Sequence, residues 1–378
     1  MTRPLTLLWQ INAVDGETPW LPSTRSPATF DRLRTLASRL DELGFFGALT
    51  TAREAIALVS TTEHLRFLVP EYPGVKPPAL LAEEAQVFDA YSGGRLIYNQ
   101  INGRDTILAR YGVDLDHDTR YEYSAEYWTQ FKALYADDRS GYQGKHFHYG
   151  PQFRPEHFGP RQAPHTPVWG SGQSPAGIAH AGESLDAYLF FLARPEAARG
   201  QVDAVRAGAA AHGRSIRIGA LSSIIVRETE EEAWAEFERR LSLTPPEPII
   251  ESADRYVRSI NGARLRDLKH PHPHVQARID ALNAGRLPTL DELRFAPAQA
   301  SGIWPVAEPA FDILGRGSSN YLVGSADNVA ARIHEISDQL GIDIWIFQSW
   351  PLLQEAEYVA RLLFPLIERH HPAPVLAD

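Results

Sequence analysis

Along most of the chain, short apolar runs alternate with segments whose apolar residues recur at helical spacing. Short apolar runs are typical of buried strands, and between them apolar residues recur at helical spacing, as Phe30, Leu33, Ala37 and Leu40 do. Eight strand–helix units in succession imply an α/β protein whose parallel sheet closes into a (β/α)8 TIM barrel, with an open doubly wound sheet as the alternative. The predicted strands are Leu5–Ile11, Phe46–Thr50, Leu65–Pro70, Arg95–Ile101, Thr166–Gly170, Leu185–Leu192, Ile216–Arg227 and Asp343–Phe347.

The regular alternation stops between Leu243 and Ser319. Proline clusters at 245–248 and 270–274 interrupt this stretch, which shows no clear period. We expect one barrel domain over residues 1–378, with an insertion at about 243–319 after the seventh strand that acts at least partly as a lid. In the His-Pro-His-Pro-His run at 270–274, the prolines favour an extended chain without convergent carboxylates, so no metal site is predicted there.

Composition narrows the classes of function. The chain has 378 residues, 44% hydrophobic and 22% charged, which is an ordinary globular balance. Its net charge of −10 argues against a general nucleic-acid binder. The absence of cysteine excludes disulfides, thiolate–zinc sites, iron–sulfur clusters and a cysteine nucleophile. No apolar run approaches the roughly 18 residues of a membrane span, and no signal peptide is recognisable, so we expect a cytoplasmic protein without a membrane partner.

Two strand ends carry candidate ligand-binding residues. The run from Val168 to Gly177 reads as a strand, a Gly/Ser loop and a helix start, which suits a phosphate at a helix N-terminus. An ordinary tight turn with Ser174 as the N-cap explains the same residues. Asn99 and Asn102, at the end of the fourth predicted strand, face a ligand or tie down the following loop.

A third candidate lies near the end of the insertion. Arg316 stands between two glycines in Gly315–Tyr321, where a mobile backbone would let it close over an anionic group. A solvated arginine in a flexible loop is the alternative. No Gly-x-Ser-x-Gly elbow occurs, so a serine hydrolase is not supported.

Several segments, in the same order over nearly the whole chain, resemble the bacterial-luciferase-like flavin-dependent monooxygenases, and most closely the alkanesulfonate monooxygenase branch. The segments are SGGRLIYNQING (Ser92–Gly103), LDHDTRYEYSAE (Leu115–Glu126), AHGRSIRIG (Ala211–Gly219), VRET (Val226–Thr229) and LVGSADNVAAR (Leu322–Arg332). The resemblance implies a (β/α)8 barrel that binds reduced FMN supplied by a separate NAD(P)H flavin reductase. Oxygen is then activated as a C4a-peroxyflavin, which oxygenates a small organic substrate. A homodimer or homotetramer is also implied.

The resemblance also assigns roles to residues. It places the FMN phosphate on Gly170, Ser171, Gly172 and Ser174, and the flavin ring on Asn99, Ile101, Asn102 and Tyr121. Arg316 matches a functional arginine of the alkanesulfonate branch, and is our candidate catalytic residue.

The sequence departs from that branch where its enzymes bind the sulfonate. An Arg-x-His pair on strand seven is replaced by Leu221 and Ser223, a tryptophan after strand six by Phe191, and a tyrosine after strand eight by Trp350. These four replacements predict a mostly apolar substrate pocket, so the substrate is either sulfonate- or sulfone-like or a more neutral compound such as a ketone or heterocycle. The alternatives to a monooxygenase are a deazaflavin-dependent oxidoreductase of the same superfamily and a non-catalytic flavin-binding relative.

Overall fold

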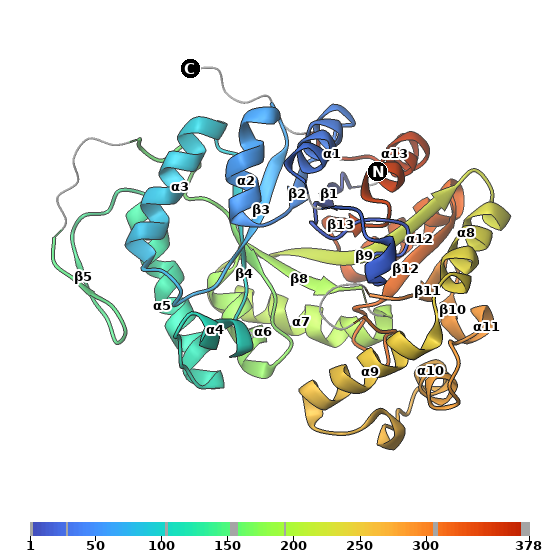
Figure 1. Cartoon of the computed structure of the whole chain (residues 1–378). Coiled ribbons are helices and arrows are strands. Elements are labelled where there is room, and N and C mark those ends of the chain that lie inside the picture. The colour runs from blue at the N-terminus through green and yellow to red at the C-terminus, as the bar shows by residue number, and fades with distance from the viewer. Residues whose placement is uncertain are drawn as a thin grey trace. The chain divides into compact units, whose positions relative to one another are not determined.

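Strands and helices alternate along the chain in the computed structural model, which describes residues 3–27, 29–102, 105–151, 158–192, 194–304 and 309–371 (Figure 1). In the described residues the barrel strands are β1 (Thr6–Gln10), β2 (Gly47–Leu49), β3 (Arg66–Glu71), β4 (Leu96–Gln100), β7 (Val168–Gly170), β8 (Ala187–Phe191), β9 (Arg217–Arg227) and β13 (Ile344–Gln348). They are hydrogen-bonded in the order β13-β1-β2-β3-β4-β7-β8, and β9 pairs with both β8 and β13. The parallel sheet therefore closes into a (β/α)8 barrel, which confirms the predicted fold and excludes the open sheet.

The helices between these strands begin and end at recognisable signals. Thr51 and Thr229 form capping boxes with Glu54 and Glu232 at the starts of α2 and α8. Pro78 opens α3, and Gly93, with φ of +69°, ends it. The helices are α1 (Phe30–Glu42), α2 (Ala52–Leu58), α3 (Pro78–Ser92), α4 (Asp105–Arg110), α5 (His117–Tyr135), α6 (Pro175–Ser184), α7 (Pro195–Ala211), α8 (Glu230–Ser242), α12 (Ala326–Leu340) and α13 (Leu352–Tyr358).

The chain divides into two compact units, which we describe separately. The first unit consists of Met1–Arg39, Phe191–Ala198 and Ala220–His370, and the second of Leu40–Phe190, Arg199–Gly219 and His371–Asp378. In the second unit, α3 and α5 lie side by side, and the Tyr98 ring of β4 packs against the α5 ring of Phe131 with centroids 5.3 Å apart. A short hairpin of β5 (Tyr142–Gln143) and β6 (His148–Tyr149) follows α5.

The first unit contains the insertion, which is more regular than the sequence suggested. It forms α9 (Pro246–Asn261), α10 (Pro273–Asn283), α11 (Leu290–Leu293), β10 (Arg294–Ala296) and β11 (Gln299–Ser301), and β12 (Asn320–Ser325) follows it. The proline clusters are helix starts rather than breaks, because Pro246 and Pro273 each occupy a first helical position. Whether part of the insertion moves as a lid stays a prediction.

A long barrel strand joins the insertion to the barrel sheet. Along its last five residues β9 pairs in parallel with β12, in the register Ser223–Tyr321 to Arg227–Ser325, and β12 continues into the antiparallel β11 and β10. A buried apolar core lies beneath these strands and includes Ile249, Ile279 and Phe311. The insertion thus shares one buried core with β9, α8 and β12 of the first unit.

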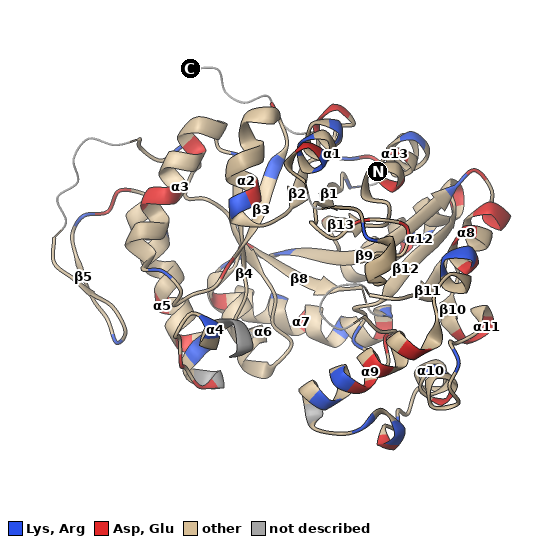
Figure 2. Cartoon of the chain, viewed as in Figure 1, with Lys and Arg blue, Asp and Glu red and all other residues tan. Residues whose placement is uncertain are grey.

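Charged residues of both signs lie mainly on helices such as α8 and α9, whereas the strands are nearly free of them (Figure 2). No helix in the described ranges is long and apolar enough to cross a membrane.

Candidate functional site

The loop between β7 and α6 holds most of the residues predicted to contact phosphate. Gly170 ends β7, and Ser174 is the N-cap of α6. The Ser174 Oγ accepts a hydrogen bond from the Gly177 N–H at 3.1 Å, and Pro175 takes the first helical position. Because the cap uses the hydroxyl oxygen as an acceptor, the hydroxyl proton stays available to a ligand.

Two glycines let this loop pack directly on the first turn of α6. A Cβ at position 172 would lie 2.8 Å from the Gly177 Cα, and a Cβ at position 177 would lie 2.9 Å from the Gly172 Cα and 3.0 Å from the Tyr121 Oη. The Tyr188 hydroxyl donates to the Gly172 carbonyl at 2.8 Å. The result is a close-packed backbone turn at a helix N-terminus, an arrangement that suits a phosphate group.

The carboxyl end of β4 lies beside this loop. Gln100 pairs in register with Gly170, and its side chain bonds to His180 of α6, while Tyr98 packs on α5. Side chains alternate along a strand, so Asn99 points to the opposite face, away from these helices.

Ile101 and Asn102 continue from β4. Ile101 is half-buried, whereas Asn102 is 2% exposed, and neither Asn102 side-chain heteroatom has a hydrogen-bond partner in the described structure. Arg120 donates from Nη1 to the Asn102 carbonyl at 2.8 Å, which fixes the backbone there. A buried amide with free donor and acceptor atoms is costly unless a ligand pairs with them, so Asn102 fits a ligand contact.

A buried histidine joins β4 to α6. The His180 Nε2 lies 2.7 Å from the Gln100 Oε1 and 3.4 Å from the Ser124 Oγ, and the Tyr121 and His180 rings are 5.8 Å apart. Burial, with a smaller contribution from Lys132, lowers the pKa of His180 to about 3. The ring is therefore neutral at pH 7, faces the protein interior, and anchors the helix that carries the phosphate loop.

The residues predicted to contact substrate all lie in the first unit. Phe191, at the end of β8, makes an edge contact with Trp304, with ring centroids 5.1 Å apart. Trp350 is 1% exposed just after β13, and its Nε1 points to the Val14 carbonyl at 3.4 Å. Both aromatic side chains lie at the carboxyl ends of barrel strands, where barrel enzymes bind their substrates.

Leu221 and Ser223 lie two residues apart on β9, so their side chains project to the same side of the sheet. Leu221 is half-buried, whereas Ser223 is buried and lies 3.3 Å from the Nε2 of Gln348, the last residue of β13. The Gln348 Oε1 is buried without a partner in the described residues. Gln348 is not among the predicted site residues, although a glutamine at the end of a buried strand is a usable signal.

Arg316 is exposed, and its guanidinium makes no hydrogen bond or ion pair with any described residue. Its loop is nevertheless well defined. The Asp312 carboxylate accepts the N–H groups of Arg316 at 2.8 Å and Gly317 at 3.0 Å, and Gly315 and Gly317 have φ of +65° and +85°. The loop thus holds a free cation, and both interpretations of Arg316 stay open.

A comparison with protein families identifies the chain. The sequence profile of the luciferase-like monooxygenases matches residues 14–343. The chain belongs to this family.

Solved structures of similar fold agree with this membership. A riboflavin lyase solved with modified FMN and riboflavin is 18% identical, with a TM-score of 0.73, and the match covers 98% of this chain and 94% of that one. A long-chain alkane monooxygenase is 17% identical, with a TM-score of 0.73 and coverage of 97% and 91%. A coenzyme F420-dependent tetrahydromethanopterin reductase from Methanopyrus kandleri is 14% identical, with a TM-score of 0.64 and coverage of 97% and 100%. At these identities the likeness shows the shared fold.

One strand-end acid of this family member was not predicted from the sequence. Glu71 ends β3 in register with Gln100 and is 5% exposed. Burial raises the pKa of Glu71 to about 7, and Lys76, whose Nζ lies 3.7 Å from the Glu71 Oε2, opposes part of that rise. No local pattern distinguishes this glutamate from an exposed one, because its burial comes from α3 and α5 packing beside β3 and β4.

Glu71 should make stability depend on pH. Its pKa is higher in the folded than in the unfolded chain, so its contribution to stability is full below pH 4.5 and is lost as the pH rises to about 7. Glu71→Gln should therefore gain about 1–3 kcal/mol of unfolding free energy relative to wild type between pH 5 and pH 8. Urea unfolding at several pH values measures this, with Glu238→Gln, at an exposed position of α8, as the control. A pH-independent difference would contradict it.

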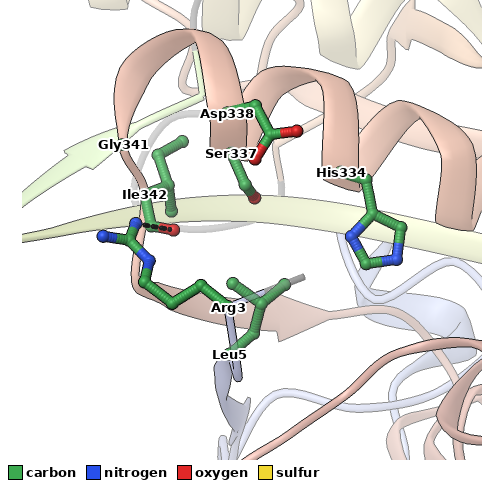
Figure 3. A pocket seen from close by; sticks show the side chains of 7 residues that line it. All are labelled: Arg3, Leu5, His334, Ser337, Asp338, Gly341 and Ile342. Carbon is green, nitrogen blue, oxygen red and sulfur yellow. Dashed lines mark hydrogen bonds between the residues drawn. The ribbon is translucent and has the colours of Figure 1, made fainter. Parts of the chain in front are cut away.

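A pocket of about 210 Å³ in the first unit lies elsewhere (Figure 3). Arg3 and Leu5 precede β1, and Ile342 precedes β13, with the Arg3 Nη2 donating to the Ile342 carbonyl at 3.0 Å. These are the amino ends of the strands, which serve stability in barrel enzymes. We therefore exclude this pocket from the candidate site.

Proposed function

We propose that this protein is a reduced-FMN-dependent monooxygenase that oxygenates a small organic substrate. One observation carries the proposal: Gly172 packs closely on Gly177 in the capped first turn of α6, beside the Ser174 hydroxyl, and this arrangement suits a phosphate group. Bound reduced FMN would supply the activation of dioxygen.

The chain's own residues would bind and orient the flavin and the substrate, and would exclude water from them. Ser171 and Ser174 would donate to the phosphate, and the unpaired Asn102 amide would pair with the edge of the flavin ring, which carries both donors and acceptors. Asn99, Ile101 and Tyr121 would contact the same ring. Phe191, Leu221 and Trp350 would form apolar walls for the substrate, and Ser223 with Gln348 a neutral polar contact.

Two assays test the function. The first measures oxygen uptake and product formation with FMN, NADH and an added flavin reductase, over sulfonates, sulfones, ketones and heterocycles. The second measures substrate-dependent reduction or oxidation of a deazaflavin without oxygen uptake. Turnover in the first supports the proposal, turnover only in the second identifies a deazaflavin oxidoreductase, and flavin binding without turnover in either identifies a non-catalytic relative.

A homo-oligomer and a separate NAD(P)H flavin reductase complete the proposal. Helix α3 exposes Leu80, Val87 and Tyr91, and α2 exposes Ile56. The α3 residues are spaced by seven and four positions and so share a face. We expect a dimer by light scattering at micromolar concentration and a monomer for Val87→Glu, because a charge on this face would oppose its burial. Tyr111→Glu, at an exposed tyrosine outside α2 and α3, should leave the mass unchanged, and a monomeric wild type would refute the assembly.

A further inference from the structure

Helix α10 of the insertion contains a buried arginine with free donors. Arg278 is 3% exposed, and its one hydrogen bond runs from Nη2 to the Asp312 carbonyl at 3.0 Å. Its Nε and Nη1 are buried and have no partner within the described residues. A guanidinium carries five N–H donors, and a buried cation without a counter-charge is costly.

The Asp312 carboxylate does not pair with this guanidinium. Both Asp312 oxygens accept backbone N–H groups, from Arg316 and Gly317. Asp312 thus shapes the loop, and offers Arg278 its carbonyl rather than a bidentate carboxylate. If Arg278 served only to hold the Asp312 carbonyl, one hydrogen-bond donor would be enough. An amide or hydroxyl side chain would supply that donor without burying a charge.

A second arginine adds to the positive charge. Arg194 is half-buried, three residues after Phe191 at the carboxyl end of β8, and its guanidinium has no partner in the described part of the chain. Burial lowers the pKa of Arg278 to about 10, with attraction from Asp312 opposing and repulsion from Arg194 adding to the effect. Burial lowers the pKa of His270, with attraction from Asp312 opposing and repulsion from the two arginines adding to the effect. Burial, the two arginines and the neighbouring histidines lower the pKa of His272.

At pH 7 the two imidazoles are therefore neutral and add no positive charge to that of the two arginines. His272 has a buried Nδ1 without a partner among the described residues, and the His270 Nε2 lies 2.9 Å from where a Cβ on Gly315 would stand. Helix α10, the segment before it and the 312–317 loop thus hold unpaired positive charge, and the charge of Arg194 after β8 acts on the same groups.

We propose that Arg278 and Arg194 form a binding site for an oxyanion group, a sulfonate, carboxylate or phosphate, carried by the organic substrate. A guanidinium binds such groups through paired N–H donors, and burial strengthens the bonds. This site changes the prediction of a mostly apolar substrate pocket. The positive charge that is absent at Leu221 and Ser223 is present on α10 and after β8. The inference rests on the proposed function only in assigning the oxyanion to a substrate.

Calorimetric titration without flavin tests the site directly. The ligands are 1-pentanesulfonate, 1-pentanol and sodium sulfate at constant ionic strength. We expect pentanesulfonate to bind at least about tenfold more tightly than pentanol, and Arg278→Gln and Arg194→Gln to weaken it at least about tenfold while leaving pentanol unaffected. Arg278→Lys, which keeps the charge but loses the fork, should be intermediate. Arg255→Gln, on the exposed side of α9, is the matched control.

Ser174→Asp separates this site from the phosphate loop and should retain the arginine-dependent binding. If Arg278→Gln fails to fold, the Arg194→Gln variant alone tests the site. The Arg194 guanidinium makes no hydrogen bond to a described residue, so its loss should not disturb folding. Unchanged sulfonate affinity in the arginine variants, or loss in Ser174→Asp alone, would overturn the site. Binding of sulfate but not pentanesulfonate would overturn its assignment to a substrate. None of these titrations needs FMN or oxygen, so a failed oxygenase assay leaves the result interpretable.

Discussion

Gly177→Ala should weaken FMN binding at least about 30-fold while leaving riboflavin binding nearly unchanged. Alanine is intrinsically better than glycine inside a helix by about 0.5–1 kcal/mol. At position 177, however, its Cβ would lie 2.9 Å from the Gly172 Cα, and backbone atoms cannot rotate aside. The loop must therefore move from the first turn of α6. A displaced loop loses hydrogen bonds to a charged group, each worth about 1.5–3 kcal/mol.

Flavin fluorescence titration measures this effect, and the two flavins isolate the phosphate. Riboflavin shares the ring but has no phosphate, so a loss confined to FMN places the phosphate at this loop. Gly200→Ala is the matched control, because Gly200 lies inside α7 with nothing within 4 Å of its would-be Cβ, and should leave FMN affinity intact. Equal loss of FMN and riboflavin affinity would indicate general damage, and unchanged FMN affinity would refute the phosphate assignment.

Much of the barrel could be predicted from the sequence, because its strands are short apolar runs separated by capped helices. The capping box of Thr229 and Glu232 and the helix start at Pro78 are local signals that tertiary packing did not override. The insertion was harder, because the first-turn proline of α10 lies in the same His-Pro run that suggested a break. Strand β12 was missed because it pairs with the far end of β9, a contact that depends on the length of β9.

In the candidate site, too, residues with local sequence signals could be predicted, and residues buried by distant elements could not. The phosphate loop is contiguous in sequence, so glycine spacing and one capping serine revealed it. Glu71, Gln348 and Arg278 were missed because each owes its character to burial by distant elements. A carboxyl, an amide and a guanidinium look alike in sequence whether exposed or buried, and only the structure shows which donors and acceptors lack partners.

Arg316→Ala should lower coupled turnover at least about 100-fold without changing stability or FMN affinity. The exposed guanidinium has no partner among the described residues, so its loss should change unfolding free energy by no more than about 0.5 kcal/mol. Because the Asp312 carboxylate holds the loop backbone rather than the side chain, the loop should keep its shape. An effect on turnover would therefore report the charge itself.

The measurement compares product with hydrogen peroxide per NADH consumed, using whichever substrate supports turnover. If Arg316 closes over an anionic group, its removal should let oxygen reduction continue while product falls and peroxide rises, because substrate is no longer held when oxygen is activated. Arg266→Ala, an exposed arginine in the same insertion, controls for lost surface charge. If Arg316→Ala forms product as efficiently as wild type, then the arginine is solvated, and the anionic group must be recognised by the buried pair on α10 and after β8 alone.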